Sequence, residues 1–311
     1  MKRELKFNED GSFKILQFTD VHWSDGSADD IKSNAVMESI LILEKPDLVV
    51  FTGDMVFSEE NAFFLQKVFE PVDKLGIPWA TVFGNHDAEI GSGKEKLLQV
   101  QQESKLCLTD AGDLAVSGLC NYYLSIKKSQ NNNPSWILYF IDSGSYNENE
   151  KVGEYDFIQR DQIDWYTKLS KKLNREFNGL PALSFFHIPL PEYNDVWDFN
   201  LCFGSKNEDC CCPKQNSGMF SAMLEMGDVK GVFVGHDHIN DYYGDLYGIK
   251  LCYGRATGYN TYGEEGFPRG ARVIRLKEGF DDFETWIRLE DGSVIASPLK
   301  HNPEGRNNPD R

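Results

Sequence analysis

The sequence lacks a long hydrophobic run. No apolar stretch among its 311 residues approaches the roughly 20 residues that a membrane-spanning helix needs, so we expect no membrane span. The basic start of the chain, Met1 to Lys6, is not followed by an apolar segment. We therefore expect no signal peptide in this sequence.

Positive charge is also scarce. The chain has 32 Lys and Arg residues against 49 Asp and Glu residues, a formal net charge of −17. An acidic surface repels nucleic-acid backbones, so we expect no nucleic-acid partner. It would also repel a small phosphate ester unless the binding site is locally positive, and bound divalent cations can supply that positive charge.

Cysteine is sparse and odd in number. Three of the seven cysteines are consecutive, at 210–212, and Cys202 lies nearby. Adjacent cysteines cannot all ligate one metal in good geometry, and a bridge between direct neighbours is strained. We favour reduced thiols for Cys210, Cys211 and Cys212 and hence a cytoplasmic protein. A disulfide to Cys202 or another partner, a functional role, and a secreted protein whose leader has been removed are the alternatives.

Histidine is rare, yet its placement is regular. Five of the six histidines stand where an apolar run ends, and only His301 lies elsewhere. A buried strand explains the apolar half of each run, but packing does not explain the polar residues that follow. These residues can bind metals or move protons: Asp20, His22, Asp54, Asn85, His86, Asp87, His187, His236 and His238.

The first third of the chain predicts a β-α-β-α-β order. Apolar runs at 15–19, 47–52 and 79–83 alternate with helical patterns at 29–44 and 58–75. Right-handed crossovers between parallel strands place all strand ends at one edge of the sheet, where ligand sites of open α/β sheets lie. We therefore expect the polar residues that end these runs to share one crevice.

The remaining chain predicts shorter elements. We expect a hairpin formed by 5–7 and 13–15, and a long irregular loop at 192–216. Further helices are predicted at 94–104, 160–173 and 217–226, strands at 122–127 and 136–141, and antiparallel strands from 247 onward. We expect a polar, frayed tail from about 298.

The donor set at the run ends favours two metal ions. Seven oxygen and nitrogen ligands are too many for one tetrahedral site. They suit two metals about 3.5–4 Å apart that share a bridging carboxylate. Because the set contains no thiolate, manganese, iron and zinc are all admissible.

Five motifs together resemble the signature of the calcineurin-like metallophosphoesterases. They are Asp-Val-His at 20–22, Gly-Asp at 53–54, Gly-Asn-His-Asp at 84–87, His187 and Gly-His-Asp-His at 235–238. The segments 235–241 and 253–259 further resemble the branch related to purple acid phosphatases. True purple acid phosphatases carry a metal-bound tyrosine where this chain has His22, so the tyrosinate-to-iron colour is not expected.

The resemblance implies a fold and a set of roles. The fold would be a four-layer α-β-β-α sandwich of two mixed sheets with flanking helices, in a single domain spanning 1–311 with its core at about 13–290. One metal would take Asp20, His22, Asp54 and His238, and the other Asp54, Asn85, His187 and His236. A metal-bridging hydroxide would attack the phosphate ester, and His86 would act as general acid or stabilise the leaving alkoxide. Asp87 would orient His86, with a helix N-cap as its alternative role.

Substrate contacts and specificity are less constrained. Arg255 is a candidate for a forked contact with a phosphate, against a structural salt bridge. Asn216 is a candidate for the phosphate pocket, against a helix cap. We expect a phosphomonoesterase. A phosphodiesterase acting on cyclic nucleotides or lipid headgroups, a phosphoprotein phosphatase and, outside enzymes, a non-catalytic metal-binding module are the alternatives.

Overall fold

The computed structural model describes residues 4–149 and 151–303. The helices within these ranges are α1 (Ala28–Glu44), α2 (Asn61–Lys74), α3 (Lys94–Gln101), α4 (Arg160–Phe177), α5 (Glu192–Phe199) and α6 (Met219–Met226). The strands are β1 (Leu5–Lys6), β2 (Ser12–Phe18), β3 (Leu48–Thr52), β4 (Trp79–Val82), β5 (Tyr122–Lys127), β6 (Pro134–Phe140), β7 (Ala182–Phe185), β8 (Cys202–Phe203), β9 (Val229–Val234), β10 (Tyr243–Leu246), β11 (Ile249–Tyr253), β12 (Gly270–Lys277), β13 (Phe283–Leu289), β14 (Val294–Ile295) and β15 (Lys300–His301).

The described strands form two mixed sheets. One has the order β14-β13-β12-β2-β3-β4, and the other β1-β5-β6-β7-β9-β11-β10-β8-β15. In the first sheet β2, β3 and β4 are parallel, as the β-α-β-α-β pattern predicts, while β12 is antiparallel to β2. In the second sheet β6, β7, β9 and β11 are parallel to one another.

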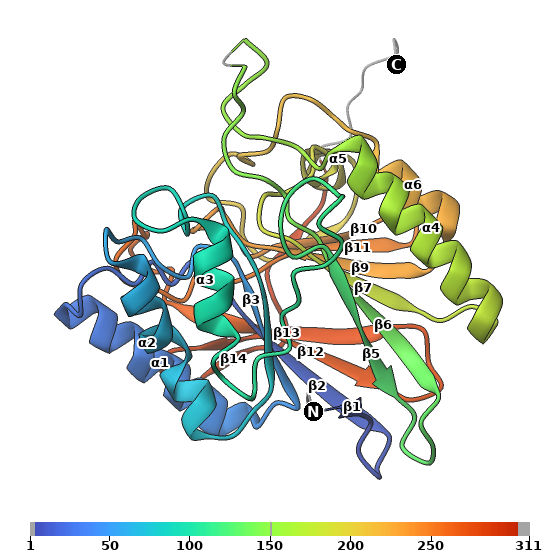
Figure 1. Ribbon diagram of the computed structural model, residues 1–311, viewed down its shortest axis with the longest axis horizontal. Helices are drawn as coiled ribbons and strands as arrows, with labels where there is room; N and C mark the ends of the chain where they lie inside the picture. Colours follow the sequence, from blue (N-terminus) through green and yellow to red (C-terminus); the bar gives the residue numbers. More distant parts are fainter. Residues whose placement is uncertain (1–3, 150, 304–311) are drawn as a thin grey trace.

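Helices cover the outer faces of both sheets, so the predicted four-layer α-β-β-α sandwich is confirmed. Figure 1 shows α1, α2 and α3 on one side of the molecule, α4 and α6 on the other, and the two sheets between them. The strands are apolar on both faces because both faces are covered. Along β6, Leu138 and Phe140 belong to one apolar cluster, whereas Ile137 and Tyr139 belong to the other.

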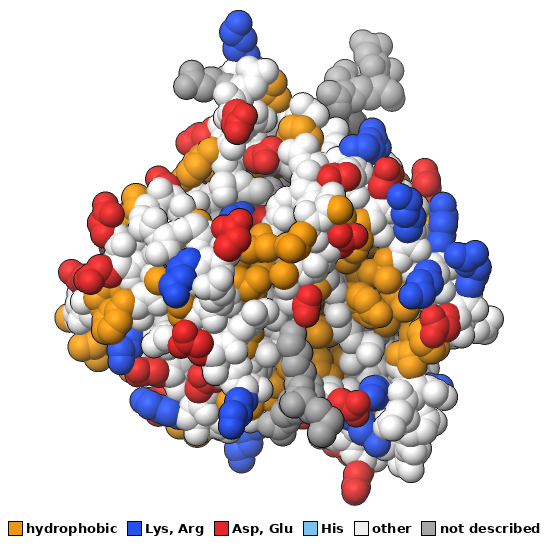
Figure 2. Space-filling model, viewed as in Figure 1, with side chains coloured by type: hydrophobic (Ala, Val, Ile, Leu, Met, Phe, Trp, Pro, Cys, Tyr) orange, Lys and Arg blue, Asp and Glu red, His pale blue; other side chains and the backbone are white. Residues whose placement is uncertain are grey.

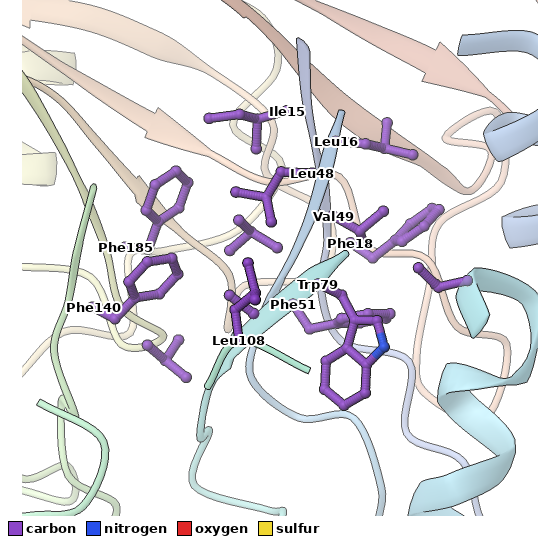
Figure 3. Close-up of a cluster of buried hydrophobic side chains, with 14 of the residues drawn as sticks. Ile15, Leu16, Phe18, Leu48, Val49, Phe51, Trp79, Leu108, Phe140 and Phe185 are labelled. Carbon is purple, nitrogen blue, oxygen red and sulfur yellow. The ribbon is translucent and has the colours of Figure 1, made fainter. Parts of the chain in front are cut away.

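The larger apolar cluster fills the space between the sheets and extends beneath α1 and α2. Figure 3 shows Phe140 and Phe185, from the nine-stranded sheet, on the same side of β2 and β3 as Ile15 and Leu48. On the outer face of the six-stranded sheet, the Trp79 ring stacks on Phe69 of α2 at a centroid distance of 4.0 Å. This packing fixes the two sheets relative to each other, and with them the strand ends that carry the polar residues.

Three local predictions are wrong. The segments 5–7 and 13–15 do not form a hairpin, because β1 pairs with β5 in the nine-stranded sheet while β2 lies in the other. The predicted loop 192–216 contains α5 and β8. The predicted polar tail includes β15, which pairs with β8, although 304–311 lie outside the described residues. In each case a tertiary contact orders a segment that has little sequence pattern.

The surface is acidic but uneven. Basic side chains gather over α4 in Figure 2, where Lys168, Lys171, Lys172 and Arg175 are exposed. No helix within the described ranges is long and apolar enough to cross a membrane. All seven cysteines, which lie within the described ranges, carry free thiols, as we favoured for 210–212.

Candidate metal centre

Five strand ends from both sheets converge on one buried cluster of polar side chains. Asp20 and His22 follow β2, Asp54 follows β3, and Asn85 follows β4 in the six-stranded sheet. In the other sheet His187 follows β7, and His236 and His238 follow β9. All seven residues are buried, with Asp20, Asp54 and His187 at 0% exposure. The structure therefore brings together every residue that the sequence suggests as a metal ligand.

The cluster divides into two groups that share one carboxylate. Candidate ligand atoms of Asp20, His22, Asp54 and His238 lie within 4.8 Å of one another. The same holds for Asp54, His187 and His236. Asn85 belongs to the second group, since its Oδ1 lies 3.2 Å from Nε2 of His187. Asp54 is the residue common to both groups, as a bridging ligand must be.

The backbone at these strand ends adopts conformations that residues other than glycine seldom adopt. Asp20, His22, Asp54 and His236 have φ angles of 54°, 49°, 50° and 80°, in the left-handed region that costs most non-glycine residues energy. Hydrogen bonds between loops hold this geometry. The His22 amide donates to the Asp54 carbonyl at 2.9 Å, and the His236 amide donates to the Asp20 carboxylate at 3.1 Å.

Hydrogen bonds also orient two of the imidazole rings. Nδ1 of His187 lies 2.7 Å from the carbonyl oxygen of Thr52, and Nδ1 of His238 lies 2.6 Å from Oγ1 of Thr261. In both rings Nε2 then faces a carboxylate of the cluster: Asp54 at 3.1 Å for His187 and Asp20 at 3.5 Å for His238. Outer contacts of this kind fix the tautomer of metal-ligating histidines.

Buried atoms without hydrogen-bond partners show that the cluster fits metal ions. Among the described residues, no group hydrogen-bonds to Nε2 of His22 or Nε2 of His236, although both atoms are buried. A buried polar atom without a partner costs about 1–3 kcal/mol. Two cations between these atoms would satisfy them, and their oxygen and nitrogen character suits manganese, iron or zinc.

Burial and the shared carboxylates set the ionisation of the ligand groups. Burial lowers the pKa of His22 and of His236 to about 3 each, which keeps both rings in the neutral form that ligates metals. Although burial opposes it, the Asp54 carboxylate raises the pKa of His187 to about 9. Burial likewise opposes ionisation of Asp20, but His238 lowers the pKa of that carboxyl to about 2. A bound cation would replace the proton held by His187.

The expected contact between Asp87 and His86 is wrong. The Asp87 carboxylate accepts hydrogen bonds from the backbone N–H groups of four residues: Asp54, Met55, Val56 and Gly84, at 2.8–3.1 Å. Burial and the neighbouring Asp54 raise the pKa of this carboxyl to about 7. Asp87 is therefore a brace for the two strand-end loops. Its side chain is fully buried, whereas the His86 side chain is 30% exposed.

The structure does not support either predicted substrate contact, because both side chains hydrogen-bond within the protein instead. Arg255 is buried, pairs with Asp241 at 2.7 Å and donates from Nε to the Pro268 carbonyl at 2.8 Å. Asn216 donates to Glu192 at 2.7 Å and accepts from the Gly218 amide at 2.9 Å, just before α6. The alternative of a structural salt bridge is confirmed for Arg255. Asn216 forms a turn before α6 but does not cap it, because the N-cap residue of α6 is Gly218.

The comparisons with known proteins agree with this geometry. A family model described as calcineurin-like phosphoesterase matches residues 13–240, which is more than half of the chain. The chain belongs to this family. It is therefore a metallophosphoesterase. The two groups of possible metal ligands described above lie within the matched residues 13–240.

Curated relatives and solved structures extend the comparison beyond the family model. The phosphoesterase is 35% identical to "Probable inactive purple acid phosphatase 29" of Arabidopsis thaliana, over 97% of this chain and 89% of that one. It is 31% identical to "Phosphatase DCR2" of Saccharomyces cerevisiae, over 92% of this chain and 55% of that one. A dimetal phosphatase from Danio rerio shares its fold, with a TM-score of 0.56 at 16% identity over 88% of this chain and 98% of that one.

Sequence reasoning missed several residues around the phosphoesterase cluster. Thr261 orients His238, and Glu89 contacts His86. Aromatic rings also line the rim: Tyr155 lies 4.5 Å from the His236 ring centroid and Tyr262 lies 4.2 Å from that of His238. Of these residues, only Glu89 could have been suggested by the sequence, because it lies three residues after His86. The other residues come from irregular loops far from the motifs that they contact.

The close approach of the Gly84 backbone to Asp54 gives a test of the site geometry. A Cβ atom at Gly84 would lie 2.1 Å from Oδ1 of Asp54, so Gly84→Ala must displace the shared carboxylate. We expect about a hundredfold loss of phosphatase activity from such misplacement, together with weaker metal binding measured by equilibrium dialysis. Gly93→Ala is the control, because a Cβ there meets only the end of the Glu95 side chain at 3.4 Å. Equal activity of the two variants would contradict the placement of Asp54.

Proposed function

We propose that this phosphoesterase hydrolyses phosphomonoesters at a dinuclear metal centre. The observation that carries the proposal is the pair of buried ligand groups that share Asp54. Metal ions bound there would hold the phosphoryl oxygens, neutralise the charge of the transition state and lower the pKa of water. They would also make the mouth of an otherwise acidic protein attractive to an anionic substrate.

The ligand roles follow from the contacts of each side chain. Asp20, His22 and His238 would hold one ion, and Asn85, His187 and His236 the other, with Asp54 between them. The amide nitrogen of Asn85 donates to the Tyr146 hydroxyl at 3.1 Å, which turns the amide oxygen toward His187 and the second group. Asn85 thus presents its oxygen, the atom that can ligate a cation.

His86 is the proposed proton donor to the leaving group. Its backbone amide donates to Oδ1 of Asp54 at 2.8 Å, which anchors the residue beside the shared carboxylate. Its ring is 30% exposed, whereas the ligand side chains are buried, so it can meet a substrate at the mouth of the site. A positioned imidazole that protonates the departing alkoxide typically contributes 10²–10⁴-fold to the rate.

The names of relatives support a phosphatase and also raise an alternative. Three Arabidopsis thaliana relatives are named purple acid phosphatases, each with the words "probable inactive". A non-catalytic metal-binding protein is therefore the second candidate. We favour the enzyme, because a protein that only holds metals would not need a partly exposed imidazole on a residue whose backbone is anchored to the shared carboxylate.

A substrate panel on metal-loaded protein tests the proposal. Metal-free protein would be reloaded with manganese, iron or zinc and assayed with 4-nitrophenyl phosphate and with bis(4-nitrophenyl) phosphate. We expect faster hydrolysis of the monoester than of the diester. His86→Ala should lose activity mainly on a poor leaving group such as that of glycerol 2-phosphate, and less on 4-nitrophenyl phosphate. Faster hydrolysis of the diester would indicate a phosphodiesterase. Stoichiometric metal binding without turnover of either substrate would support the non-catalytic alternative.

A further inference from the structure

A carboxylate that no motif identifies lies against the His86 ring. Oε2 of Glu89 is 2.5 Å from Nδ1 of His86. The side chains are 30% and 35% exposed, so the pair lies at the mouth of the cluster. The Phe57 ring packs against the imidazole in an edge-to-face contact, with centroids 5.1 Å apart and ring planes at 71°, and this contact limits the rotation of the imidazole. The ring is thereby held through one nitrogen, Nδ1.

The Glu89 carboxylate is itself held by a chain of hydrogen bonds from the metal centre. The Tyr146 hydroxyl donates to Oε2 of Glu89 at 3.0 Å and accepts from Nδ2 of Asn85 at 3.1 Å. The Tyr146 ring stacks on Tyr155, with centroids 6.0 Å apart. Asn85, Tyr146, Glu89 and His86 therefore form one continuous network. A surface ion pair of the same sequence spacing would have no such second anchor.

From this network we infer that Glu89 is the positioning residue for His86, and that Tyr146 couples its position to the Asn85 amide. The carboxylate accepts the Nδ1 proton, fixes the orientation of the ring and leaves Nε2 as the nitrogen that meets the leaving group. The inference rests on the proposed function, in which His86 donates a proton. It gives Glu89 the role that the sequence suggested for Asp87.

The dependence of the hydrolysis rate on the leaving group distinguishes a role of Glu89 in positioning His86 from a purely structural role. A proton donor matters most for poor leaving groups, so Glu89→Ala should lower kcat for an alkyl phosphate such as glycerol 2-phosphate about 10–100-fold. Its kcat for 4-nitrophenyl phosphate should fall less than about threefold, and KM should change little. Glu89→Gln, which keeps an acceptor for Nδ1–H, should recover part of the loss. Equal losses on both substrates, or none on either, would overturn the inference.

Two reference variants make the outcomes distinct. Glu70→Ala removes another i,i+3 ion pair, with Lys67 at 2.6 Å on the surface of α2, and should behave as wild type. His86→Ala should show the same leaving-group dependence as Glu89→Ala, but more strongly. If His86→Ala lacks that dependence, the proposed function fails. If His86→Ala shows it and Glu89→Ala does not, only the role of Glu89 fails.

The tautomer of His86 in the metal-free protein supplies a readout that does not depend on activity. In buffer alkaline enough to keep the ring neutral, ¹⁵N chemical shifts should place the proton on Nδ1 in the wild type. In Glu89→Ala the proton should move to Nε2, and Tyr146→Phe should shift the population part of the way. An identical tautomer in wild type and Glu89→Ala would overturn the inference, even if the variant is less active.

Discussion

Asp54→Asn should lower kcat/KM for an aryl phosphate by about a thousandfold or more, because one side chain serves both ligand groups. Oδ2 of Asp54 lies 3.1 Å from Nε2 of His187 and 3.5 Å from Nε2 of His22. Asparagine keeps the shape but loses the negative charge and one of the two oxygens. We therefore expect the variant to remain folded and to bind fewer metal ions, as measured by elemental analysis after dialysis.

The matched control for this variant is Asp281→Asn. Asp281 is exposed and lies 3.8 Å from Lys230, in a surface pair that contributes little. Its activity and metal content should equal those of the wild type. If Asp54→Asn kept full metal content and more than a tenth of the activity, Asp54 would not be the shared ligand.

Asp87→Ala should lower the free energy of unfolding by about 3–5 kcal/mol, which is a large effect for one substitution. It removes the acceptor of four backbone N–H groups in the loops that carry Asp54 and Gly84. Activity should fall as well, because the position of Asp54 depends on these contacts. Urea denaturation of metal-free protein would measure the stability without a contribution from bound metal.

Asp291→Ala provides the comparison for Asp87. The Asp291 carboxylate also accepts from backbone, but from the single amide of Ser293 in an exposed turn. We expect a change in unfolding free energy of less than about 1 kcal/mol. A similar value for Asp87→Ala would show that its four contacts do not brace the loops. Normal stability with selective loss of His86 function would instead restore Asp87 as the orienting residue.

The layout of the site was predictable from sequence because it follows from strand topology. Apolar runs that stop at Asp, Asn or His mark buried strands with polar ends, and parallel strands gather those ends at one edge. That reasoning correctly places Asp20, Asp54 and Asn85 near one another, because β2, β3 and β4 are parallel strands of one sheet. His187 lies in the other sheet, so the family resemblance rather than this reasoning grouped it with them. The reasoning from strand topology needs only the period and length of each run, which are local properties of the chain.

The contacts of individual polar side chains were not predictable in the same way. Asp87 and Glu89 are both carboxylates close to His86 in sequence, and the chain path after Gly84 decides which one meets the ring. The positive φ angles of Asp20, His22, Asp54 and His236 leave no sequence signature, since none is glycine. The substrate contacts predicted for Arg255 and Asn216 are not supported, because the hydrogen-bond partners of these residues, Asp241 and Glu192, cannot be predicted without the fold.

The same limit explains the errors in the fold. Strand β1 has the length and polarity of a hairpin arm, and the turn before β2 does form, with the Asn8 amide donating to the Ser12 carbonyl at 3.0 Å. Leu5 nevertheless pairs with Ile126 across the molecule. Two-residue strands such as β1, β8 and β15 depend on edges offered by distant segments, so local pattern cannot assign them.

The central claim is that one carboxylate, Asp54, joins two cation sites. Anomalous diffraction from crystals of the manganese-loaded or zinc-loaded protein tests it most directly. We predict two peaks about 3.5–4 Å apart on either side of the Asp54 carboxylate, one beside His22 and His238 and the other beside His187 and His236. A single peak, or two peaks that do not both contact Asp54, would contradict the account.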